Sequence, residues 1–250
     1  MKRWLYIGGA VLVVIVVGLY ILFSSLNSIV KAAVEKVGSS ATQAQVKLKD
    51  VNIELTAGNG ALRGLTVGNP KGFTTERALS LGEISLQVDV STVTKDTVVI
   101  KEIVISAPDV TYELAGGGSN MDALKRNVDA YAGTGAGKAG KSTGGSEGGR
   151  KLIIENLYIR NGKVNVSAPG LEGKTLSAPL PEFHLTNIGK QSGGATAGEV
   201  AQQVLAAISQ AATKAAVSLP DVGKLVGSAR EGAEGAAKGA GEGLKKLLGK

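Results

Sequence analysis

Val98-Val-Ile-Lys-Glu-Ile-Val-Ile105 is a strand-like stretch whose apolar pattern occurs twice in this chain. It is followed by Val110 and Tyr112. The pattern returns at a constant offset of 54 residues, as Leu152-Ile-Ile-Glu-Asn-Leu-Tyr-Ile159 with Val164 and Val166 behind it. Self-similarity of this kind indicates a reused supersecondary unit, which we interpret as a β-hairpin.

The residues around the repeat alternate between apolar and polar, as in half-buried strands. Examples are Val51-Asn-Ile-Glu-Leu55 and Ile84-Ser-Leu-Gln-Val-Asp-Val90. Turn signals separate the runs and predict antiparallel neighbours. They are Gly58-Asn-Gly60, Gly68-Asn-Pro70, Lys95-Asp96, Ala107-Pro-Asp109 and, as the strongest hairpin signal, Asn161-Gly162.

The chain is therefore expected to be mainly β, α+β overall, with a curved antiparallel meander that forms a groove. We divide it into a cytoplasmic stub and transmembrane anchor (1–23), an amphipathic connecting helix (24–40), a β-groove domain (41–190) interrupted by a Gly-rich segment (116–150), an amphipathic helix (191–219) and a low-complexity Gly/Ala/Lys tail (220–250).

The anchor is predicted from Trp4 to Phe23, where twenty residues carry no charge and span about 30 Å as a helix. A signal peptide is the alternative, but its apolar region is usually only about 7–15 residues long. Lys2 and Arg3 precede the segment and the next charge is Lys31, so the N-terminus is expected in the cytoplasm and the remainder outside it.

Three further helical segments follow from periodicity. Residues 24–37 place Leu26, Ile29, Val30, Ala33, Val34 and Val37 at helical spacing. Asn120 is expected to cap a short helix from Met121 to Val128. Thr196 to Leu219 has an apolar face that either covers the end of the sheet or lies on the membrane.

Composition excludes several function classes. The chain has no cysteine, which rules out disulfides and thiolate metal sites. Its net charge of +7 is dispersed, and aromatic residues make up only 4% of it, so a nucleic-acid surface is not expected. Dispersed positive charge instead suits anionic lipid headgroups.

Catalytic motifs are weak, and we expect no enzyme, cofactor or metal. Gly135 to Ser142 fits the phosphate-loop pattern, but neither a buried strand nor a helix flanks it, so no nucleotide is expected. His184 is the only histidine and is assigned to a sheet face. The acidic residues of the strands are assigned to a solvated outer face. They are Glu83, Asp89, Glu102 and Glu113.

One apolar face of the sheet must be covered by something. Its predicted residues are Ile53, Leu55, Ile84, Leu86, Val88, Ile103, Ile105, Val110 and Tyr112. Either the chain's own helices close it into an ordinary core, or the twisted sheet forms an open trough for lipid acyl chains.

From the anchor to about Ile208, the order of motifs resembles the AsmA-like family of bacterial envelope proteins. The resemblance rests on Leu65-Thr-Val-Gly-Asn-Pro-Lys-Gly-Phe73, on the stretch from Val99 to Glu113, and on Ser119-Asn120. Within the first motif, Asn69, Pro70, Gly72 and Phe73 are interpreted as structural, because Pro70 ends a strand and Gly72 permits a bend.

Membership would imply a single-pass inner-membrane protein with a periplasmic β-groove of the kind found in bridge-like lipid-transfer proteins. Such proteins are associated with phospholipid transport and outer-membrane maintenance. The expected partners are phospholipids, other envelope proteins, or further copies paired through edge strands. About eight to ten strands would give a groove of only about 40–50 Å, too short to bridge an envelope alone.

Overall fold

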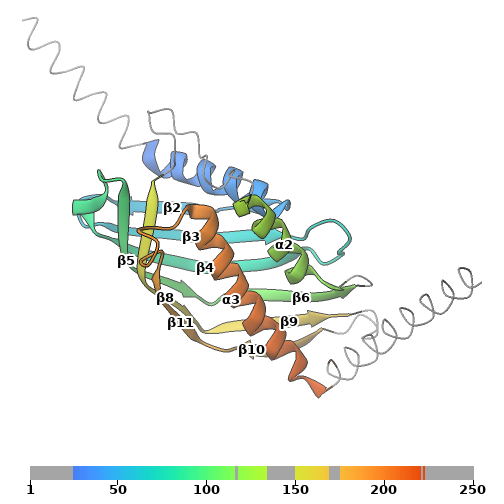
Figure 1. Ribbon diagram of the computed structural model, residues 1–250. Helices are drawn as coiled ribbons and strands as arrows, with labels where there is room; N and C mark the ends of the chain where they lie inside the picture. The colour runs from blue at the N-terminus through green and yellow to red at the C-terminus, as the bar shows by residue number, and fades with distance from the viewer. Residues whose placement is uncertain (1–24, 116–117, 134–149, 169–174, 221, 223–250) are drawn as a thin grey trace, which may run out of the picture.

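The computed structural model describes residues 25–115, 118–133, 150–168, 175–220 and 222. This part of the chain is α+β: three α-helices lie against one large, open, mixed sheet of eleven strands (Figure 1). The helices are residues 25–42, which we call the edge helix, α2 (Asn120–Gly133) and α3 (Ala197–Val217). No helix in the described ranges is long and apolar enough to cross a bilayer, and the predicted anchor Trp4 to Phe23 lies outside them.

The strands are between 2 and 12 residues long, and one 3₁₀ turn follows β4. The elements are β1 (Val46–Lys47), β2 (Asp50–Glu54), β3 (Asn59–Gly68), β4 (Arg77–Val88), η1 (Val90–Thr92), β5 (Thr97–Ser106), β6 (Asp109–Ala115), β7 (Gly118–Ser119), β8 (Lys151–Arg160), β9 (Gly162–Ser167), β10 (Leu176–Leu180) and β11 (Phe183–Ile188).

In four places, two strands that follow one another in the chain continue in the same direction and differ only by a kink between them. We call each such continuous stretch a run. β5 and β6, for example, both pair antiparallel with β4, and the register does not change between Ser106, opposite Glu83, and Asp109, opposite Ser80. The same holds for β1 with β2, β8 with β9, and β10 with β11. Apart from β7, the sheet is therefore six neighbouring runs in sequence order.

The repeated stretches lie side by side as parallel strands. β5 pairs with β8 and β6 with β9, and the offset of 54 residues is kept throughout, with Val98 opposite Leu152 and Val110 opposite Val164. A parallel pair needs a crossover connection, and the chain between β6 and β8 contains α2. The prediction of a wholly antiparallel meander is wrong at this step, whereas the other neighbouring runs are antiparallel.

Two predicted turns are kinks within a run. The chain does not reverse at Ala107-Pro-Asp109 or at Asn161-Gly162. A two-residue type I′ hairpin needs positive φ at both central residues. In the described residues φ is positive at Asn161 (55°) but not at Gly162. The prediction that the repeated unit is a hairpin is therefore wrong.

The kinks lie at one level across the sheet. Gly64 (φ 64°), Ala107 (49°) and Asn161 (55°) all adopt left-handed backbone there. Ile105 and Val110 are an odd number of residues apart, so they would face opposite sides of an uninterrupted strand. Both nevertheless belong to the same buried core. The kinks keep the apolar side chains of each run on one face.

Helices α2 and α3 cover part of that face (Figure 1). α3 packs on β6, β8, β9 and β10, and α2 packs on α3 and β6. The residues that α3 buries are Gly198, Ile208, Ser209, Ala211, Ala212, Ala215 and Ala216. The predicted helix Thr196 to Leu219 is confirmed, with Thr196 as its cap, and it covers the sheet.

The N-terminus of α2 differs from the prediction. The helix is longer than expected, and Asn120 is its first residue rather than its cap. Ser119 precedes it, and its Oγ accepts a hydrogen bond from the backbone N–H of Asp122 at 3.1 Å. Asn120 is fully buried and its side chain bonds to other elements.

We predict that Gly162→Ala destabilises the fold by about 1–3 kcal/mol, because the added methyl group overpacks the kink. A Cβ at this position would lie 2.7 Å from Pro108 Cγ and 2.9 Å from Leu180 Cβ. Gly133→Ala is the matched control, since no heavy atom lies within 4 Å of its added Cβ. Urea unfolding followed by circular dichroism measures both variants, and equal stability would contradict the kink geometry.

Candidate functional site

The inner face of the sheet, on which α2 and α3 lie, carries apolar residues in matched rows across neighbouring strands. One row contains a residue from every run and lies between the level of the kinks and the level of the β2–β3 turn. Its members are Ile53, Gly60, Leu86, Ile103, Leu157 and Leu185. Burial is not uniform: Leu157 is 1% exposed, whereas Ile53, Leu86 and Ile103 are only half-buried.

Six of the predicted groove residues form a connected, incompletely covered surface, which we call the apolar strip. It consists of Ile53, Leu55, Ile84, Leu86, Val88 and Ile103. Leu55 is 41% exposed and the other five are half-buried. Gly60 lies in the middle of the strip, where the Leu86 side chain lies over it, 2.9 Å from where a Cβ would be. The Leu86 side chain therefore occupies the space that a side chain at position 60 would fill.

The remaining predicted groove residues are in the packed core. Ile105 is 4% exposed, Val110 0% and Tyr112 7%. Val110 and Tyr112 follow the kink in their run and lie on β6, against which α2 and α3 pack. The protein itself buries these three side chains, so we leave them out of the apolar strip.

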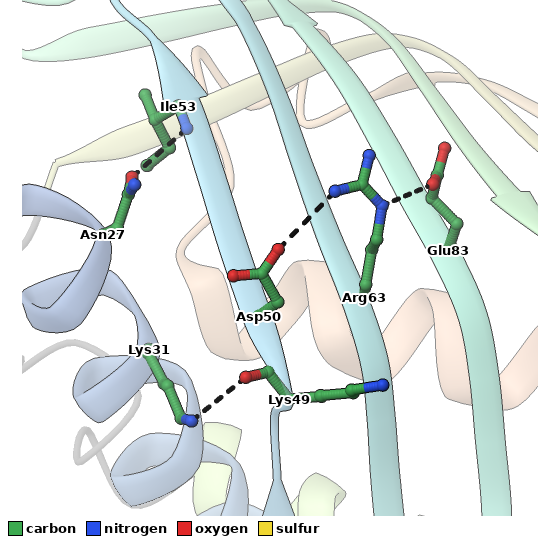
Figure 2. Close-up of polar contacts among 7 residues, drawn as sticks. All are labelled: Asn27, Lys31, Lys49, Asp50, Ile53, Arg63 and Glu83. Carbon is green, nitrogen blue, oxygen red and sulfur yellow. Dashed lines mark hydrogen bonds and ion pairs between the residues drawn. The ribbon is translucent and has the colours of Figure 1, made fainter.

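The edge helix lies along the first edge of the sheet and bonds to it through polar side chains (Figures 1 and 2). Asn27 accepts from the backbone N–H of Ile53 at 3.2 Å, and Lys31 donates to the carbonyl of Lys49 at 3.2 Å. Further along the helix, the Glu35 carboxylate accepts from Leu48 N and the Ser39 hydroxyl from Val46 N, both at 2.9 Å.

These four side chains recur every fourth residue and therefore form one ridge of the helix. They bond to backbone groups of β1 and β2, and of the short link between those strands, that no neighbouring strand reaches. Unpaired edges template unwanted strand pairing, and this ridge occupies one of them. Sequence reasoning missed this role, although a polar i, i+4, i+8, i+12 series beside an apolar one was a visible signal.

The predicted apolar face of the edge helix is split by this arrangement. Leu26, Val30 and Val34 are half-buried, whereas Ile29 is 55% and Val37 39% exposed. The helix thus turns polar side chains to the protein and part of its apolar stripe away from it.

The outer face of the sheet is polar. Arg63 lies between two carboxylates of neighbouring strands, 2.9 Å from Glu83 and 3.5 Å from Asp50 (Figure 2). The hydrogen bond and charge of Glu83 raise the pKa of Arg63 above its ordinary value. This row of charged side chains helps to fix the strand register, and water screens the charges because the face is exposed.

His184 lies on the same outer face. Its ring stacks on Tyr158 with centroids 4.1 Å apart, and the Arg160 guanidinium lies 4.5 Å from the centre of the Tyr158 ring. His184 Nε2 is 3.0 Å from Asn156 Oδ1. This placement on a sheet face agrees with the prediction, and the neighbours form a cross-strand stack.

A buried polar cluster, which we call the clasp, ties the β3–β4 loop to β6 and α2. Glu113 is 5% exposed, and its carboxylate accepts hydrogen bonds from the backbone N–H and hydroxyl groups of Thr74 and Thr75 at 2.6–2.9 Å. Asn120 donates to Asn69 Oδ1 at 2.8 Å and accepts from Glu113 N at 2.9 Å. The prediction that Glu113 lies on the solvated face is wrong.

The clasp sets the ionisation of Glu113. Burial by itself would raise the pKa of this carboxyl, but the hydrogen bonds from Thr75 and Thr74 outweigh burial and hold the pKa below its ordinary value. The charged form is therefore the one that the fold requires.

The motif residues of the β3–β4 loop have local structural contacts. Asn69 Nδ2 donates to the carbonyl of Thr75 at 2.6 Å within the clasp. Pro70 is buried, Gly72 adopts φ 97°, and Phe73 is half-buried. The positive φ at Gly72 is the bend that the sequence predicted for a residue without a side chain.

Little in the described ranges has the geometry of a reaction centre. They contain no group of three or more histidine or carboxylate side chains placed to hold a metal ion. The phosphate-loop-like segment Gly135 to Ser142 lies outside these ranges. The arrangement that is present, an apolar strip beside a fixed helix, is suited to binding apolar groups.

Neither a scan against protein-family models nor a search of curated proteins found a match to this chain.

We predict that Glu35→Ala weakens the fold and exposes the first sheet edge. The loss leaves the N–H of Leu48, a residue that is 2% exposed, without its acceptor, which costs about 1–3 kcal/mol. Lys36→Ala, at the next and outward-facing position, is expected to change stability by less than about 0.5 kcal/mol. Urea unfolding and light scattering test both, and the idea fails if the two variants behave alike.

A second prediction concerns acid stability. Because the folded pKa of Glu113 is depressed, its stabilisation is present above the unfolded value near 4.5 and is lost as pH falls through the lower folded value. Glu113→Gln should lose about 2–3 kcal/mol at pH 7, since the single oxygen of an amide cannot accept from all the N–H and hydroxyl groups of Thr74 and Thr75. It should also flatten the fall of unfolding free energy below pH 4.5. Glu102→Gln, at an exposed strand position, should retain the wild-type pH profile.

Proposed function

We propose that this protein is a membrane-anchored, non-catalytic lipid-binding protein of the AsmA-like kind, acting in phospholipid transfer or envelope maintenance. The observation that carries the proposal is the apolar strip, whose half-buried rows continue outward to Leu55, which is 41% exposed. An apolar surface of this kind on the inner face of a sheet is unusual unless something occupies it.

The dimensions of the apolar strip suit one acyl chain. From Ile84 to Val88 the apolar strip extends about 13 Å at about 3.3 Å per residue. One leaflet of a bilayer contributes about 15 Å of hydrocarbon, half of its total thickness of about 30 Å. Each methylene group removed from water stabilises the complex by about 0.8 kcal/mol, so a partly seated chain would bind measurably.

The width of the sheet supports a role at one membrane and not across the envelope. Six runs of chain, separated by about 4.8 Å, give a sheet about 25 Å wide, which is shorter than the groove expected from the sequence. We therefore propose uptake of phospholipid at the bacterial inner membrane, on its periplasmic side, or service to a longer partner. The N-terminus would be cytoplasmic.

A second candidate is a membrane-tethered scaffold with a closed core and no lipid cargo. The observation that favours it is the complete cover over the other half of the sheet, where Val110, Val164 and Val166 are 0% exposed beneath α2 and α3. In that case the partners would be other envelope proteins, or further copies of the chain paired through strand edges, and they would bind away from the apolar strip.

We propose no enzymatic activity and no nucleotide or nucleic-acid ligand. We expect the unmodified chain to bind no nucleotide, so that Lys141→Ala changes nothing in a nucleotide-binding measurement.

Lipid analysis of the purified full chain tests the function. Leu86→Asp places a charge in the centre of the apolar strip and should lower the phospholipid bound per chain at least twofold, as measured by mass spectrometry after purification in mild detergent. Gln87→Asp is the matched control, because Gln87 is exposed on the outer face of the same strand. Both variants keep the anchor, so lipid held there cancels, and equal lipid content in the two would favour the scaffold.

A further inference from the structure

We infer that one end of the sheet is seated on the bilayer surface. This end, which we call the tip, consists of the β2–β3 turn with Leu55 and the chain after β4 with Val90. The inference deepens the proposed function and rests on its membrane anchoring. It assigns the occupant of the tip: the hydrocarbon boundary of a phospholipid bilayer.

Exposed large apolar side chains gather at the tip. In the described part of the chain, five such residues stand out. Leu55 is 41% and Val90 43% exposed, and Ile29, near the start of the edge helix, is 55% exposed. Leu55 is the first residue after β2, and Val90, the first residue of η1, lies two residues after the end of β4. A Cβ on Gly58 would lie 2.8 Å from Val90 Cγ2, which places Val90 against the β2–β3 turn.

The edge helix fixes how far the tip is from the predicted anchor. Asn27 is bound to Ile53 at the tip end of β2. Only three residues lie between Asn27 and Phe23, and the four residue-to-residue steps span at most about 14 Å even when fully extended. Ile53 is in turn two residues from Leu55, or about 7 Å along a strand. Asn27, from which the chain leads back to the uncharged segment, is thus held close to the exposed residues of the tip.

The opposite end of the edge helix is held away from the tip. Ser39 bonds to Val46, at the far end of the edge strand, so helix and strand run in opposite directions. Val37 lies ten residues beyond Asn27, about 15 Å along the helix. A bilayer in contact with the tip therefore leaves Val37 in water, although it is 39% exposed. With the tip seated in this way, the apolar strip opens directly towards lipid.

Single-cysteine labelling tests this seating, and the chain has no native cysteine to remove. Ile29→Cys, Leu55→Cys, Val90→Cys, Val37→Cys and Val217→Cys each change one exposed position and would carry a nitrobenzoxadiazole fluorophore. The labelled full-length chains are reconstituted into phosphatidylcholine–phosphatidylglycerol vesicles that contain doxyl-labelled lipid. Vesicle flotation and circular dichroism confirm incorporation and folding.

We expect at least twofold quenching by doxyl lipid at Ile29, Leu55 and Val90, and none at Val37 or at Val217, the control at the end of α3. Quenching at Val37 without quenching at Leu55 and Val90 would mean that the edge helix lies flat on the membrane, and would overturn the inference. Leu55 and Val90 signals no greater than that of Val217, or a chain that does not float, would also overturn it. Tip quenching without a lipid difference between Leu86→Asp and Gln87→Asp would keep the seating and reject the lipid-binding function.

Discussion

The structure depends on one constraint: the runs of the sheet that kink do so at the same level, and they must still present their apolar side chains to one face. Left-handed residues at Gly64, Ala107 and Asn161 meet this constraint. Because of them, residues separated by an odd number of positions, such as Ile105 and Val110, lie in the same core. The duplicated runs share the kink because they pair in parallel with a constant offset, so their irregularities lie side by side.

A kinked sheet with open edges needs protection, and the edge helix supplies it on one side. It does so with side chains in place of a strand: Asn27, Lys31, Glu35 and Ser39 reach backbone groups of β1, β2 and their link. Since its polar ridge points inward, part of its apolar stripe points outward. The burial pattern of this helix is thus explained by the hydrogen-bonding needs of the strand beside it.

Burial differs between the two halves of the inner face, and this difference underlies the proposed function. Under α2 and α3 the core side chains are fully buried, and the clasp around Glu113 holds the loop before β4 to β6 and α2. Towards the tip the same cross-strand rows continue with partial cover only. A surface built like a core but left half-open is the physical basis for proposing an apolar ligand there.

The sequence by itself determined the strands, the helix from Ala197 to Val217 and the repeat offset, because periodicity and capping are local properties. Alternation also predicted a nine-residue apolar face, of which six residues form the apolar strip and three, Ile105, Val110 and Tyr112, are buried in the core. Only the tertiary structure decided that the repeated stretches pair in parallel, since Asn161-Gly162 suits a reversal equally well until Pro108 and Leu180 close around Gly162. It likewise buried Glu113, whose carboxylate accepts hydrogen bonds from Thr74 and Thr75 in a loop nearly forty residues earlier in the chain. Such long-range partners leave no trace in local pattern, and they determined which parts of the inner face are closed and which remain open.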